Sequence, residues 1–76
     1  MPHVIVKLYP GRSEAQKQKL AEAITKAVVE IADSAERSVS VSIEDVAPDK
    51  WTETVYKPEI LGKPDLLYKK PGYEPV

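Results

Sequence analysis

The sequence predicts an α/β (α+β) fold: a β-α-β unit with two parallel strands, completed by oligomerisation. Two short segments alternate between apolar and polar residues, as strands do, and the segment between them has the apolar spacing of a helix. The chain also has only 76 residues and no cysteine, so its core is small and no disulfide reinforces it. Association with further subunits is therefore the expected source of additional stability.

The first strand is predicted over residues 3–9. Val4, Val6 and Leu8 share one face, and the odd-numbered residues share the other. Pro10 and Gly11 follow, and this dipeptide is typical of a turn.

A helix of about 20 residues is predicted to begin near Glu14. Ser13 and Gln16 form a capping-box pattern, in which each side chain accepts a hydrogen bond from the other residue's backbone N–H. The apolar residues of one face are Leu20, Ile24, Ala27, Val28 and Ile31. The pattern ends at Asp33 and Ser34, so we expect this face to pack on the sheet.

The second strand is predicted over residues 38–44, where Val39, Val41 and Ile43 alternate with polar residues. A strand, a helix and a second strand form a right-handed crossover with parallel strands. Because a sheet of only two strands is marginally stable and parallel sheets are usually covered on both faces, we expect a second copy to complete it.

The remainder, residues 48–76, is predicted to be a tail of short helical turns and irregular chain. Five of the seven prolines lie between Pro48 and Pro75, and the apolar period is lost. A short turn of helix is expected over residues 65–70, and the tail's leucines and tyrosines favour docking on a neighbour or over a cleft; a partly frayed terminus is the alternative. Residues 1–76 are accordingly one domain, with a core over about 2–46.

Composition excludes several classes of protein. Eleven basic and twelve acidic residues give a net charge of -1, which is unlike a nucleic-acid-binding domain. With no cysteine and one histidine, a zinc centre is not expected. No apolar run of bilayer-spanning length and no basic-apolar leader is present, so the sequence predicts a cytoplasmic protein without membrane contact.

Pro2 is the candidate catalytic residue. Removal of Met1, which is ordinary before a small second residue such as proline, exposes a secondary amine at the new N-terminus. An α-amino group has a pKa of about 7.7–8.0, and desolvation or nearby cations lower it toward neutrality. A terminal proline in such surroundings is therefore a general base.

The sequence around Pro2 resembles the 4-oxalocrotonate tautomerase family. The resemblance rests on the opening residues 1–8, the Gly-Arg-Ser stretch of residues 11–13 before the helix, the second strand, and Trp51 at the family's aromatic position. The closing Lys-Lys-Pro-Gly-Tyr of residues 69–73 is most similar to the PptA-type bacterial branch. Essentially the whole chain is covered.

The resemblance implies a tautomerase that interconverts enol and keto forms of a small 2-oxo or 2-hydroxy-enoic acid. It implies that Pro2 shuttles the proton, that Arg12 binds a substrate carboxylate, and that Trp51 walls the pocket. It also implies that no metal or organic cofactor is needed and that the chain forms a homo-oligomer, either dimers or trimers of dimers. The proline-rich tail favours the dimer.

One departure from the family bears on the substrate. Ser40 stands where well-known members carry a second arginine, so a two-carboxylate substrate is in doubt and Ser40 becomes a substrate-binding candidate of a different kind. A monoacid such as an arylpyruvate enol fits better, with its carboxylate on Arg12 and its ring against Trp51. His3, beside the amine, is a candidate for tuning it.

Two alternatives remain open at this level. The first is a different reaction on the same scaffold, in which a protonated Pro2 assists the cofactor-free addition of water to a haloacrylate. This reaction requires a carboxylate that activates the water. The other alternative is a non-catalytic self-assembling module in which the proline is incidental. While Met1 is attached, the nitrogen of Pro2 is an amide and cannot act as a base.

Overall fold

The computed structural model describes residues 1–74; Pro75 and Val76, the end of the predicted tail, lie outside them. The chain separates into two compact units, Met1–Asp45 and the segment from Val46 onward. That the two units make one domain stays a prediction. Within residues 1–74, no helix is long and apolar enough to cross a membrane.

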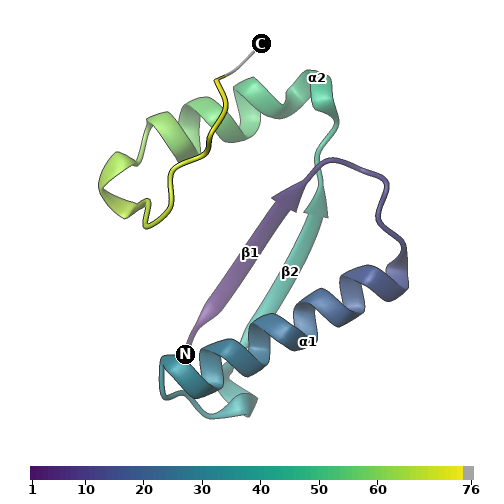
Figure 1. The fold of residues 1–76 in the computed structure, drawn as a ribbon, viewed down its shortest axis with the longest axis vertical. Coiled ribbons are helices and arrows are strands. Elements are labelled where there is room, and N and C mark those ends of the chain that lie inside the picture. The colour runs from purple at the N-terminus through teal and green to yellow at the C-terminus, as the bar shows by residue number, and fades with distance from the viewer. Residues whose placement is uncertain (75–76) are drawn as a thin grey trace. The chain divides into compact units, whose positions relative to one another are not determined.

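The first unit is a β-α-β unit (Figure 1). Strand β1 spans His3–Leu8, helix α1 spans Glu14–Ile31, and strand β2 spans Ser40–Asp45 after a short 3₁₀ turn, η1, over Glu36–Ser38. The strands are parallel, and their register runs from His3 opposite Ser40 to Leu8 opposite Asp45. The predicted β-α-β fold with parallel strands is confirmed, with both strands slightly shorter or shifted at their ends, and its completion by oligomerisation stays a prediction.

Alternation along the two strands follows the predicted pattern. Val4, Val6 and Val41 are half-buried, whereas Ile5 on the opposite parity is 55% exposed. No residue from Met1 to Asp45 is fully buried. A single β-α-β unit therefore leaves much of its apolar surface uncovered, as expected for a sheet of two strands.

Helix α1 begins at the predicted cap. The Ser13 hydroxyl accepts from the Gln16 N–H over 3.1 Å, and the Gln16 amide oxygen accepts from the Ser13 N–H over 2.8 Å. The helix ends at Ile31 with Ala32 as its C-cap, and Asp33 then adopts a left-handed conformation (φ 56°) that stops the helical path.

The prediction that one apolar face of α1 is buried is partly wrong. Ile24 and Val28 are half-buried, but Leu20, Ala27 and Ile31 are exposed, with Ile31 85% exposed. The half-buried face instead continues on the other flank, through Ala21, Thr25 and Val29. A sheet of two strands is only about 10 Å wide, so it covers part of a broad apolar stripe and leaves the rest open.

The second unit contains more helix than the sequence predicted. Helix α2 (Pro48–Trp51) leads directly into a π-helical segment, η2 (Thr52–Leu61), and a 3₁₀ turn, η3 (Pro64–Leu66), follows. Pro48 lies at the first helical position, where its missing N–H costs no hydrogen bond. Pro58 lies inside the segment; there a proline disturbs α-helical hydrogen bonding and removes the regular period that sequence patterns detect.

Candidate active site

Pro2 lies in the first unit, immediately before β1, which starts beside the N-terminus marked in Figure 1. The backbone N–H of Ser40 donates to the carbonyl oxygen of Pro2 over 3.1 Å, which extends the β1–β2 pairing by one residue. Pro2 is half-buried, whereas Met1 before it is fully exposed. A backbone hydrogen bond therefore holds Pro2 at the end of the sheet where β1 begins.

Ser40 also bonds His3 through its side chain. The two residues are register partners, and the hydroxyl oxygen of Ser40 lies 2.6 Å from Nδ1 of His3. Pro2, His3 and Ser40 are thus brought together at one end of the sheet. The pairing of an imidazole with this serine is not visible in the sequence, since 37 residues separate them.

Arg12 lies at the opposite end of β1, in the loop that leads to α1. The strand has six residues, and at about 3.3 Å per residue its ends are roughly 20 Å apart. Nη1 of Arg12 donates to the carbonyl oxygen of Tyr9 over 3.1 Å, so the guanidinium stays at that end. Within one chain the structure does not bring Arg12 and Pro2 together.

A second charged contact lies at the Arg12 end of the sheet. Nζ of Lys17 donates to Oδ2 of Asp45 over 3.0 Å, and Oε1 of Glu14 is 3.8 Å away. The hydrogen bond to Asp45 raises the pKa of Lys17 above its ordinary 10.5, against a smaller opposing effect of lost hydration. The sequence analysis did not predict this pair. It could have done so, because the start of a crossover helix and the end of the second strand lie at the same end of a parallel sheet, where a lysine and an aspartate can meet.

Trp51 is the last residue of α2 and belongs to an aromatic cluster in the second unit. Its indole Nε1 donates to the hydroxyl oxygen of Tyr73 over 2.8 Å, and the ring of Tyr73 lies 5.6 Å from that of Tyr56 at an interplanar angle of 49°. Tyr56 and Tyr73 also border an open hollow of about 340 Å³ beside Lys70. The sequence singled out Trp51, but the residues that hold it come from elsewhere in the unit.

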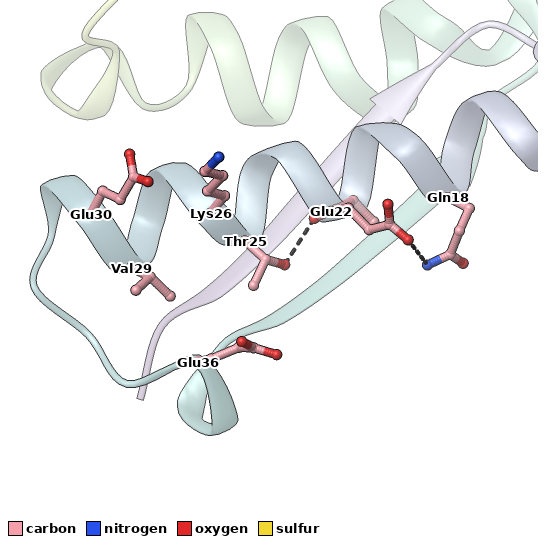
Figure 2. Close-up of a pocket in the computed structure, with 8 residues that line it drawn as sticks. Gln18, Glu22, Thr25, Lys26, Val29, Glu30 and Glu36 are labelled. Atoms are coloured by element: carbon pink, nitrogen blue, oxygen red, sulfur yellow. Dashed lines mark hydrogen bonds between the residues drawn. The ribbon is translucent and has the colours of Figure 1, made fainter.

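A further groove of about 450 Å³ runs beside α1 in the first unit. Figure 2 shows its lining, in which Gln18 donates to Glu22 over 3.4 Å and the Thr25 hydroxyl donates to the backbone of Ala21 over 2.8 Å. None of the predicted site residues lines it. The groove is therefore separate from the predicted site, and residues 1–74 hold no cluster of three metal-binding side chains.

The comparisons with known proteins show the family of this chain. The family model described as "Tautomerase enzyme" matches residues 2–54, and its match begins at that proline. The chain belongs to the 4-oxalocrotonate tautomerase family. The resemblance seen in the sequence is thereby confirmed, and membership of this family supports a tautomerase function and an isomerase class of enzyme.

Two curated relatives align with this chain over most of their own length. The chain is 44% identical to Tautomerase PptA of Cronobacter sakazakii, covering 97% of this chain and 99% of that protein. It is 40% identical to a probable tautomerase of Xylella fastidiosa, covering 96% and 89%.

Two solved tautomerase homologues have the same fold. YwhB, a homologue of 4-oxalocrotonate tautomerase, aligns with a TM-score of 0.62 at 40% identity over 63% of this chain and 79% of that one. TomN, a homologue from the tomaymycin biosynthetic pathway, aligns with a TM-score of 0.63 at 34% identity over 66% and 77%.

Proposed function

We propose that this protein interconverts the enol and keto forms of a small 2-oxo acid, with Pro2 as the general base once Met1 is removed. The observation that carries the proposal is the family match, which starts at Pro2 and is supported by tautomerase-named relatives along almost the entire chain.

The chemistry requires one group that accepts and then returns a proton. Neutral Pro2 takes the proton of the enol hydroxyl, and the electron pair of the broken O–H bond forms the carbonyl. The electron pair of the C=C bond then takes a proton from the prolinium at the neighbouring carbon, which restores the base. The hydrogen bond from Ser40 to the Pro2 carbonyl supports this role, because it restricts the amine without using its nitrogen.

Arg12 binds the substrate carboxylate in this proposal, since a guanidinium pairs with a carboxylate through two parallel hydrogen bonds. Arg12 and Pro2 of one chain lie at opposite ends of β1, so we assign the Arg12 of each site to another copy. Exposed apolar side chains on the first unit, such as Ile5 and Ile31, support association into a homo-oligomer, for which we favour a dimer.

The proposed substrate is a monoacid with an aryl group, such as an arylpyruvate enol. Ser40 contributes a neutral hydroxyl, which is bonded to His3, at the position where a second arginine would bind a second carboxylate. The indole of Trp51 supplies an apolar face for the aryl ring and excludes water, which favours uncharged Pro2.

Haloacrylate hydration is the less favoured reaction on this scaffold. It needs a carboxylate that is available to activate water, but Asp45 is bonded to Lys17 and Glu53 is bonded to Lys57 over 2.8 Å. Glu59 also has an interaction partner. These contacts engage three of the carboxylates that could activate water, and Glu44 on β2 is the remaining candidate for that reaction.

The test is the ketonisation of phenylenolpyruvate by protein whose intact mass confirms the loss of Met1. Pro2→Ala is expected to lower kcat/KM by about 10²–10⁴-fold. A matched control keeps Pro2 but extends the N-terminus by two residues, so that its nitrogen is an amide; it should be equally inactive.

Equal rates for all three proteins, at the level of buffer, would refute the proposal for this substrate class and favour the non-catalytic module. A two-carboxylate 2-hydroxy-enoic acid turned over faster than phenylenolpyruvate would refute the monoacid assignment alone. The mass in solution, measured by light scattering, separates a dimer from a hexamer.

A further inference from the structure

The hydrogen bond between Trp51 and Tyr73 ties the end of the described chain to the start of the second unit's helical segment. The two residues are 22 positions apart, and the 2.8 Å distance from the indole nitrogen to the phenol oxygen is that of a well-formed bond. An indole has one N–H, so this bond selects one rotation of the ring.

Tyr73 is itself held by a buried partner. Tyr56 is only 6% exposed, and its ring packs against Tyr73 with centroids 5.6 Å apart in a tilted arrangement. A chain of contacts therefore runs from buried Tyr56 through Tyr73 to Trp51. Because Tyr56 fixes the ring of Tyr73, the hydroxyl of Tyr73 is presented at a defined place for the indole.

We propose that Tyr73 is a positioning residue that sets the affinity for the aryl part of the substrate by orienting Trp51. This rests on the proposed function, in which Trp51 lies against the aryl ring. Tyr73 acts on binding and not on proton transfer, so its loss should raise KM and leave kcat nearly unchanged. The C-terminal segment is then a determinant of specificity and not only a structural tail.

The test compares Tyr73→Phe with the parent protein and with Tyr68→Phe. The first variant removes the hydroxyl but keeps the ring against Tyr56, so folding should be preserved. The second makes the same chemical change at a fully exposed tyrosine of the same segment. Trp51 is the only tryptophan, so its fluorescence reports directly on the indole.

We expect Tyr73→Phe to lower the fluorescence anisotropy of Trp51 and to increase its quenching by acrylamide. We also expect about a three- to tenfold rise in KM for phenylenolpyruvate, with kcat within about twofold of the parent, which is the range for loss of one neutral hydrogen bond. The dissociation constant of 3-phenylpropanoate, an unreactive aryl acid, should rise by the same factor. Tyr68→Phe should match the parent throughout.

The inference is overturned if Tyr73→Phe leaves the fluorescence unchanged, or changes it without weakening 3-phenylpropanoate binding, or if the parent does not bind this acid. Pro2→Ala keeps the two proposals apart. This variant should lower kcat/KM by about 10²–10⁴-fold yet keep the parental Trp51 fluorescence and the parental affinity for 3-phenylpropanoate. Activity retained by Pro2→Ala would refute the proposed base, while the binding comparison would still decide the role of Tyr73.

Discussion

The backbone N–H of Ser40 donates a hydrogen bond to the carbonyl oxygen of Pro2 over 3.1 Å, while the side chain of Ser40 lies 2.6 Å from Nδ1 of His3. One residue of β2 thus fixes the backbone of the candidate base and bonds the side chain next to it. The two contacts are separable by mutation, since only the second needs the hydroxyl.

Ser40→Ala should therefore have a modest effect. The backbone bond to Pro2 remains, so we expect kcat to stay within about threefold of the parent, and KM to rise about two- to fivefold as one neutral hydroxyl is lost from the site. Steady-state ketonisation kinetics measure both. A loss of kcat as large as that of Pro2→Ala would show that the hydroxyl acts in proton transfer, contrary to this assignment.

Arg12→Ala should raise KM by about 10–100-fold, the range for a hydrogen bond between charged groups. Arg12→Lys should recover only part of this, because a lysine cannot form two parallel hydrogen bonds to a carboxylate. Arg37→Ala, which removes an exposed arginine of the η1 turn, serves as the control for the change in net charge and should leave KM unaltered. Similar losses at both positions would point to a general effect of charge.

Mixing two variants that are each impaired in kcat/KM tests whether sites are shared between copies. When Pro2→Ala and Arg12→Ala chains are unfolded together and refolded in equal amounts, about a quarter of the sites should hold Pro2 from one chain and Arg12 from the other. Activity should therefore rise toward roughly one quarter of the parental value. A mixture no more active than its components would mean that both groups act from the same chain.

The Lys17–Asp45 bond should make stability depend on pH at the alkaline end. Because the folded pKa of Lys17 is raised, its contribution is fully present below its ordinary pKa of 10.5 and is lost as pH rises through the folded pKa. Urea unfolding at about pH 9 and about pH 11.5 measures the loss, and Asp45→Asn should reduce it. An equal loss of stability in parent and variant would show that the Lys17–Asp45 bond is not its cause.

Gly62 should not tolerate a side chain. A Cβ at this position would lie 2.5 Å from the carbonyl oxygen of Pro58 and 3.0 Å from that of Lys57, both fixed in the helical backbone. We expect Gly62→Ala to cost about 1–3 kcal/mol of unfolding free energy. Gly72→Ala is the matched control, since its Cβ would meet nothing within 4 Å, and it should be neutral or slightly stabilising.

Much of the first unit was predictable because its signals are local. The alternation around Val4 and Val41 reports which side chains face the helix, and the Ser13–Gln16 cap is complete within four consecutive residues. The prediction of the buried face of α1 failed in part, because burial depends on partners that are distant in the sequence. The half-buried face of α1 includes Val29 and not Ile31, because the width of a two-stranded sheet decides how much of an apolar stripe is covered.

By itself, the sequence determined the β-α-β order, the start of α1 and the candidacy of Pro2, all of which rest on residues close together along the chain. Only the tertiary structure decided that Ser40 holds Pro2 and that Tyr73 bonds Trp51. Hydrogen bonds of this kind join positions far apart in sequence. Their formation depends on strand register and loop path, which no local pattern of residues encodes.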